Sequence, residues 1–275
     1  MREIGLHLRY NGSFAQIARK ALELELPLFQ CFLVAKMVGA LVEPDAADIA
    51  EFVRLRREHF GNLFVHGSYW INLAGLGRGG KQALASELAL AKRLEFTHMI
   101  LHPGAHNGDT KEEGIASLAK SLNALLARER DITIVLENTA HGASTVGGDF
   151  NDFVLLRSYL NHPEKIAYCI DTAHAYAYGY NLVDATEREA CIALLDTTLG
   201  IENIVLIHLN DTYEKLGSKL DKHQTLGQGS LGETALRAFS FHERLRAIPL
   251  LMELPVVSQE EEERNLALVR GWHIK

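Results

Sequence analysis

Short apolar runs alternate with amphipathic helical patterns along the whole chain. Eight of these runs predict strands, and in chain order they cover residues 3–9, 27–34, 62–66, 98–102, 132–137, 166–171, 203–209 and 249–254. Between and after them, apolar residues recur at helical spacing. This spacing predicts helices over residues 13–26, 45–58, 80–94, 111–128, 150–160, 185–199, 232–245 and 258–271.

Two of the predicted strands, 132–136 and 204–207, are apolar on both faces. This pattern is typical of parallel strands that are covered on one side by helices and on the other by a barrel interior. Eight strand–helix units without a break in composition predict an α/β fold, a single (β/α)₈ TIM barrel over residues 1–275. The alternative is an open doubly wound sheet. That fold normally carries a glycine-rich loop after the first strand, and residues 8–13 do not form one.

Composition and charge narrow the choice of environment and partner. The chain has no apolar run near the roughly 20 residues that span a bilayer, and the sequence runs from Met1 straight into a predicted strand, so we expect neither a signal peptide nor a membrane partner. Three scattered cysteines favour a reducing cytoplasm. The net charge of −7 argues against binding to DNA through bulk positive charge. Divalent ions bound at one site would add positive charge there, so the net charge would not exclude DNA binding at that site.

Histidine, aspartate and glutamate residues recur at or just beyond the carboxyl ends of the predicted strands. In a barrel these positions converge on one mouth. One such residue alone is more often a capping group than a ligand, but a buried set of carboxylates and imidazoles is hard to satisfy without metal ions. The set comprises His66, His102, Glu137, Asp171, His174, His208, Asp221, His223 and Glu253.

The number of candidate ligands indicates how many ions are bound. A metal with open positions takes three protein ligands, so nine residues with one bridging carboxylate fit three ions. Imidazole and carboxylate without thiolate suit zinc, and also manganese or iron. A cluster of this size suits hydrolysis of a phosphodiester, whereas sugar isomerisation needs only one or two metals.

At these residues the chain resembles the endonuclease IV family of apurinic/apyrimidinic endonucleases, which share the xylose-isomerase-like TIM barrel. The resemblance covers nearly the whole length and rests on several motifs in the same order. These are residues 66–73 (HGSYWINL), 102–106 (HPGAH), 136–140 (LENTA), 171–180 (DTAHAYAYGY), 208–211 (HLND), 221–223 (DKH) continuing to the GQG at 227–229, and Glu253.

The resemblance implies a trinuclear zinc site whose first ion is bound by His66, His102 and Glu137. The second ion takes Glu137 as a bridge together with Asp171, His208 and Glu253. The third takes His174, Asp221 and His223. The family cleaves DNA on the 5′ side of an abasic sugar, leaving a 3′-hydroxyl and a 5′-deoxyribose phosphate, and also trims blocked 3′ ends. The resemblance further implies that Glu137 and Glu253 are catalytic, and that double-stranded DNA with abasic sites is the partner of a monomeric enzyme.

The resemblance also implies residues that contact DNA. Tyr69 matches an aromatic wedge that enters the minor groove and helps to open the duplex, although packing at the barrel rim is an alternative. Asn72 lies in the same motif, and His7 at the end of the first predicted strand is a further candidate. The chain departs from the family at residues 33–40, where an arginine that probes the duplex is absent; the nearest candidates are Lys36 and Met37.

Two other functions remain open. Sugar isomerases and epimerases on the same barrel resemble the chain in four residues that can hold a single metal, namely Glu137, Asp171, His208 and Glu253. They do not need the other five candidate ligands. A relative that binds damaged DNA without cleaving it is the third possibility, and the complete ligand set argues against it.

Overall fold

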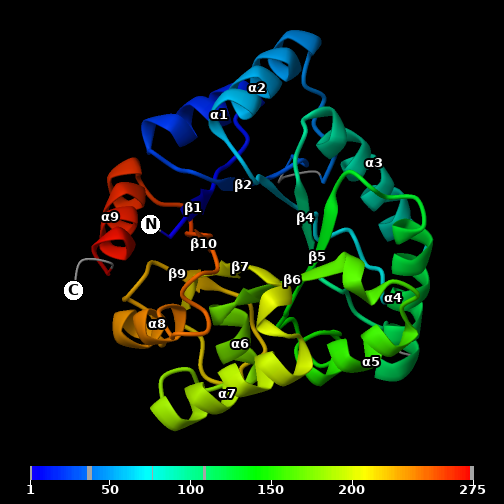
Figure 1. Ribbon diagram of the computed structural model, residues 1–275, viewed down its shortest axis with the longest axis vertical. Coiled ribbons are helices and arrows are strands. Elements are labelled where there is room, and N and C mark those ends of the chain that lie inside the picture. The colour runs from blue at the N-terminus through cyan, green and yellow to red at the C-terminus, as the bar shows by residue number, and fades with distance from the viewer. Residues whose placement is uncertain (1, 36–38, 76, 108–109, 273–275) are drawn as a thin grey trace.

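The computed structural model describes residues 2–35, 39–75, 77–107 and 110–272. Eight parallel strands close into a barrel in the order β1-β10-β7-β6-β5-β4-β3-β2, as the sequence predicted (Figure 1). The strands are β1 (Ile4–His7), β2 (Phe29–Phe32), β3 (Phe64–His66), β4 (His98–Leu101), β5 (Thr133–Glu137), β6 (Ile166–Asp171), β7 (Ile204–His208) and β10 (Leu250–Met252).

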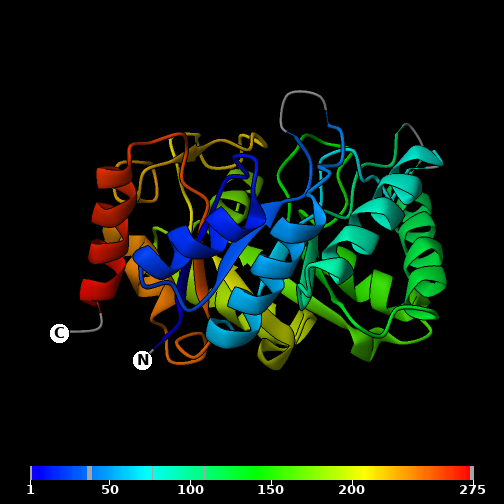
Figure 2. The same cartoon turned by 90° about the horizontal axis from the view of Figure 1, so that it is seen from above.

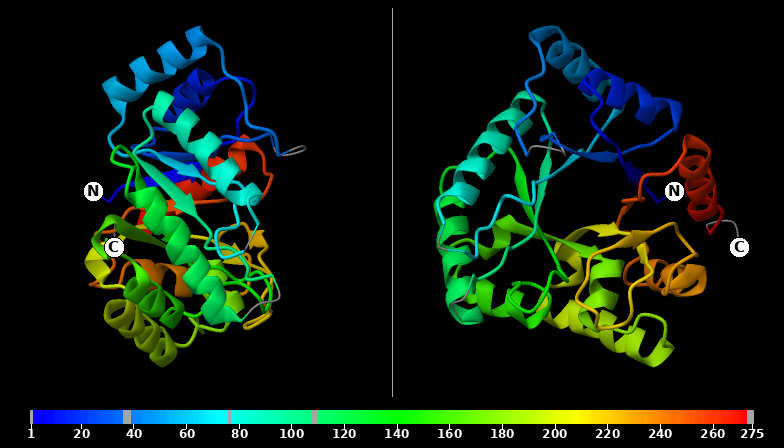
Figure 3. Two further views of the ribbon diagram at one scale, coloured as in Figure 1. Left: turned by 90° about the vertical axis from the view of Figure 1, so that its right-hand side faces the viewer. Right: turned by 180° about the vertical axis from the view of Figure 1, so that it is seen from behind.

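Helices surround the barrel on its outside, and Figure 3 shows this ring in two further views. The predicted helices are confirmed as α1 (Phe14–Glu23), α2 (Ala46–His59), α3 (Gly79–Arg93), α4 (Lys111–Leu126), α5 (Asn151–Tyr159), α7 (Ala185–Thr198), α8 (Gly232–Ser240) and α9 (Gln259–Gly271). Local capping sets several of their starts. The hydroxyl of Ser13 accepts a hydrogen bond from Gln16 N at the start of α1, and Thr110 and Glu113 form a capping box at α4.

Two layers of apolar side chains explain why the strands are apolar on both faces. Inside the barrel lies a buried cluster that includes Phe64, Ile100, Val135, Leu206 and Leu251. A larger buried cluster fills the space between the strands and the outer helices. Strands buried on both sides form a rigid base, so the residues at their ends are held in fixed positions.

Short elements that the hydrophobic pattern did not predict follow β6 and β7. Helix α6 (Thr172–Tyr178) begins at the next residue after β6 and is too short for a helical period to be visible. After β7 the chain forms an antiparallel hairpin of β8 (Asp211–Thr212) and β9 (His223–Gln224). Two 3₁₀ turns, η1 (Pro163–Lys165) and η2 (Ile201–Asn203), precede β6 and β7. Helix α6 and the hairpin both lie at the carboxyl ends of the strands.

The barrel has two distinct ends. In Figure 2 the loops that follow β7 and β10 lie along the upper edge, and the N-terminus lies at the opposite edge. The upper edge is therefore the mouth at which the carboxyl ends of the strands open. Among the described helices, none is long and apolar enough to cross a bilayer.

Candidate metal centre

The barrel brings all nine predicted ligands to its mouth. Four of them are the last residues of their strands, namely His66, Glu137, Asp171 and His208. His102 and Glu253 directly follow β4 and β10. The parallel register places Asp171 beside His208 across the β6–β7 pair. The remaining three come from α6 and from the hairpin loop after β7.

Glu137 lies at the centre of the site and is fully buried. Its Oε2 atom is 3.0 Å from Nε2 of His66 and 3.2 Å from Nε2 of His102. Its Oε1 atom faces the other way and lies 3.0 Å from Nδ1 of His208. The two oxygens of one carboxylate thus serve two groups of side chains, which is the arrangement that a bridging ligand requires.

Two groups of potential ligand atoms share Glu137. The first comprises His66, His102 and Glu137, and the second comprises Glu137, Asp171, His208 and Glu253; within each group the ligand atoms lie within 4.8 Å of one another. Nδ1 of His208 lies 3.4 Å from Oε2 of Glu253 and 4.0 Å from Oδ2 of Asp171. The structure brings together the same residues that the family resemblance assigns to these two groups.

The third group is assembled by the two elements that the sequence did not predict. Asp171 caps α6 by accepting a hydrogen bond from His174 N at 2.8 Å, which fixes His174 beside the second group. The hairpin carries Asp221 and His223 back over the mouth. Oδ1 of Asp221 lies 3.2 Å from Nε2 of both histidines.

The hydrogen bonds of the histidines test whether these groups fit a metal. A carbonyl oxygen only accepts, so each Nδ1 that contacts one must carry a proton, and loss of the second proton of the ring leaves the lone pair on Nε2, where a metal ion can bind. This holds for His66 on Gly67 O at 2.7 Å, His174 on Asn138 O at 2.8 Å and His223 on Glu253 O at 3.0 Å. Nε2 of His174 is buried and makes no well-aligned hydrogen bond, although Oδ1 of Asp221 lies 3.2 Å away. A metal ion there would satisfy it.

The electrostatics of the site point the same way. Burial opposes ionisation of Glu137, but His208 and His102 outweigh it and hold the pKa of Glu137 well below its usual range. Burial would lower the pKa of His223, yet Asp221 and Asp171 raise it to about 9. Without ions, protonated imidazoles therefore balance the buried carboxylates, and divalent cations are suited to replace those protons.

Comparison with known proteins identifies the family. A family model described as xylose isomerase-like TIM barrel matches residues 19–270. A probable endonuclease 4 of Heliobacterium modesticaldum is 32% identical over 257 residues and covers 92% of each chain. The chain belongs to the endonuclease IV family. A probable endonuclease 4 of Halorhodospira halophila is 34% identical over 93% of this chain and 89% of its own length. The crystal structure of endonuclease IV from Thermus thermophilus superposes with a TM-score of 0.86 at 29% identity, covering 99% of both chains.

In this member of the endonuclease IV family, a buried glutamine positions two ligands of the second group. It was not among the residues predicted from the sequence. The amide nitrogen of Gln30 donates to Oε1 of Glu253 at 2.6 Å, and its oxygen accepts from Nε2 of His208 at 3.0 Å. The second bond leaves Nδ1 of His208 free to face the carboxylates. A single polar residue within the apolar strand β2 was the signal that could have identified it.

Asn210 and Asp211 follow His208 closely and brace the loops around the ligands. The amide of Asn210 donates to Asp171 at 2.6 Å and to Glu253 at 3.1 Å. Asp211 is fully buried and accepts hydrogen bonds from the backbone N–H groups of Gly227 and Gly229, at 3.0 and 2.9 Å. The HLND and GQG motifs are thus joined by one carboxylate.

The predicted DNA contacts lie in different surroundings. Tyr69 stands over the site, with its ring centroid 5.8 Å from that of His102 and 68% of the residue exposed. The amide of Asn72 bonds to the backbone of Ala105, so it ties two loops together. His7 lies 2.9 Å from the amide nitrogen of Gln30 and is largely covered. The two remaining candidates, Lys36 and Met37, lie outside the described residues.

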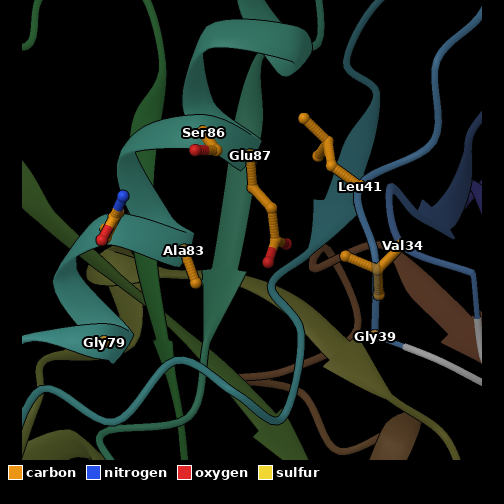
Figure 4. Close-up of a pocket in the computed structure, with 8 residues that line it drawn as sticks. Val34, Gly39, Leu41, Gly79, Ala83, Ser86 and Glu87 are labelled. Carbon is orange, nitrogen blue, oxygen red and sulfur yellow. The ribbon is translucent and has the colours of Figure 1, made fainter.

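The loop that carries Tyr69 is anchored by a second buried carboxylate. Ser68 donates to Glu87 through its backbone N–H at 3.0 Å and through its hydroxyl at 2.5 Å. Glu87 is on α3 and 2% exposed, and burial raises its pKa. It lines a cavity of about 300 Å³ together with Val34, Gly39, Leu41 and Ala83. Figure 4 shows its side chain pointing into this cavity. Ser68 directly precedes Tyr69 in the chain. Its hydrogen bonds to Glu87 therefore fix the backbone position from which the tyrosine ring projects.

Proposed function

We propose that this protein is a metal-dependent DNA-repair endonuclease. It hydrolyses the phosphodiester on the 5′ side of abasic sites, leaves a 3′-hydroxyl and a 5′-deoxyribose phosphate, and also trims blocked 3′ ends. The observation that carries the proposal is the convergence of nine imidazole and carboxylate side chains into three groups around Glu137. The endonuclease 4 names of relatives that match over more than nine tenths of the chain support it.

We infer that the three groups hold three zinc ions, with manganese or iron in some positions. Imidazole and carboxylate donors without thiolate suit these metals, and none of the three groups contains a cysteine. Bound divalent ions would supply a nucleophile from water near neutral pH and would neutralise charge on the attacked phosphate and the leaving oxygen.

The protein's own residues hold and orient the reacting groups. Glu137 and Glu253 are the catalytic carboxylates in this proposal. Glu137 ties the first group to the second through its two oxygens. Glu253 is fixed from two sides, because Gln30 donates to Oε1 and Asn210 to Oε2. Carboxylates held in this way keep their geometry while a phosphate enters, and this preorganisation favours the transition state.

We propose that duplex DNA lies across the barrel mouth with Tyr69 inserted at the lesion. An exposed aromatic ring above the candidate metal centre suits a wedge in the minor groove. An abasic nucleotide has lost its stacking, so it costs less to extrude than an intact one. Asn72, His7, Lys36 and Met37 complete the proposed contact set.

Incision of a defined substrate tests the proposal. The purified protein is incubated with a labelled duplex that carries one abasic site, after zinc or manganese has been restored. We expect a single cut on the 5′ side of the lesion and no cut in the undamaged duplex. Failure to cut with either metal would refute the endonuclease assignment.

The second candidate function is a sugar isomerase or epimerase. It is favoured by the second group alone, because Glu137, Asp171, His208 and Glu253 can hold one metal beside a substrate carbonyl. An isomerase with one metal gives no role to Asp221 or to the hydrogen bonds that orient His66, His174 and His223. Metal analysis separates the two functions, since the endonuclease requires about three ions per chain and the isomerase about one.

A further inference from the structure

A tenth side chain reaches the candidate metal centre. His141 lies in the loop between β5 and α5, four residues after Glu137, and was not among the ligands predicted from the sequence. Its Nε2 atom is 3.2 Å from Oδ2 of Asp221. One nitrogen each of His102, His141 and His174 lie within 4.8 Å of one another. The imidazole of His141 therefore stands beside the third group and faces the first.

Asp221 lies between His141 and the other residues of the third group. Its Oδ1 atom faces His174 and His223, while its Oδ2 atom faces His141. The ring centroid of His141 is 5.7 Å from that of His174 and 5.2 Å from that of His102. Three imidazoles thus surround one carboxylate, which is a donor set that borderline divalent cations prefer.

Backbone contacts hold this arrangement independently of the side chains. Gly142 N donates to Lys219 O at 3.0 Å, which joins the loop of His141 to the loop of Asp221. Gly142 has a φ of +77°, a conformation that favours glycine. The side chain of His141 is 37% exposed, so it closes the solvent side of the third group.

We propose that His141 is a fourth protein ligand of the metal ion held by His174, Asp221 and His223. This inference rests on the proposed metal cluster. A site with three protein ligands keeps a position open, and the imidazole of His141 fills it as the fourth ligand. The third ion is then retained more firmly, while the first group, with three protein ligands, keeps its position open for the substrate phosphate.

Metal binding by His141→Ala tests the proposal. Wild-type and variant proteins are equilibrated at a series of buffered free zinc concentrations, and bound zinc per chain is measured by mass spectrometry. We expect two ions to bind as in the wild type and the third at least about tenfold more weakly. His162→Asn is the matched control, because His162 pairs with Glu164 on the surface, away from the ligands.

The outcomes separate this inference from the proposed function. If wild type and His141→Ala bind three ions with equal affinity, His141 is not a ligand, and a raised KM for abasic DNA would then assign it to the phosphate. If the wild type binds fewer than three ions, the cluster itself and the inference both fail. Two retained ions in the variant report that the barrel is folded. Visible absorption of the cobalt-substituted proteins gives a second readout, since losing an imidazole changes the spectrum of the third ion and leaves the others unchanged.

Discussion

Replacing Glu137 with glutamine removes the charge that connects the first two groups while keeping the shape of the side chain. Glu137 is fully buried, and its oxygens lie 3.0 Å from His66 Nε2, 3.2 Å from His102 Nε2 and 3.0 Å from His208 Nδ1. In Glu137→Gln one of these positions is taken by an amide nitrogen, which cannot bind a metal. Two ions therefore lose a charged ligand through one substitution.

The size of the effect follows from the number of ions affected. Removing a group that merely orients a ligand weakens metal binding about 10- to 100-fold. The lower value applied to each of two ions gives a combined loss of at least about 100-fold, or about 2.7 kcal/mol. At a fixed free zinc concentration, we expect the incision rate of Glu137→Gln to fall below about 1% of the wild-type rate.

Single-turnover incision of an abasic duplex measures this loss, and bound zinc is counted on the same samples. The matched control is Glu129→Gln, because Glu129 is also a buried carboxylate but pairs with Lys92 at 2.8 Å and precedes β5 at the opposite end of the barrel. We expect near-normal incision by this control. Near-normal turnover by Glu137→Gln would remove Glu137 from the mechanism.

Three further predictions concern the loop, its anchor and pH. Tyr69→Ala should reduce incision of duplex DNA but change the free energy of unfolding by no more than about 0.5 kcal/mol, because the residue is 68% exposed. Equal losses in incision and in thermal stability would indicate that Tyr69 is a packed residue of the barrel rim. Ser68→Ala should destabilise the protein by about 1–3 kcal/mol in urea titrations, since the buried Glu87 loses a donor, with unchanged bound zinc; unaltered stability would contradict this anchor. The pKa of His223 is about 9 in the metal-free protein, so below that pH zinc must displace its proton. The zinc affinity of the third group should therefore fall as pH decreases from 9 towards 6.5, and a pH-independent affinity in competition titrations would refute this.

The barrel itself was predictable because its cause is local. Apolar runs with buried faces form the strands, and helical spacing between them forms the outer ring, so both appear in the sequence pattern. The same pattern placed candidate ligands at the strand ends, and the family resemblance divided them into groups. His66, Glu137 and His208 end their strands, and parallel strands in a closed barrel open at one mouth.

The remaining parts of the site depend on contacts between distant segments. Gln30 meets His208 across 178 residues of sequence, and Glu87 acts through Ser68 on another element. His141 reaches Asp221 only because the hairpin of β8 and β9 returns over the mouth. A two-residue strand leaves too little periodicity to be seen, so neither the hairpin nor its consequence for His141 was predicted.

Anomalous diffraction at the zinc edge from crystals of the protein gives the number of bound ions and their ligands together, so it is the most direct test of a trinuclear site around Glu137. We expect three peaks at the barrel mouth, with Glu137 between the first and second and with His174, Asp221 and His223 around the third. A single peak enclosed by Glu137, Asp171, His208 and Glu253 would contradict the trinuclear endonuclease and favour the isomerase.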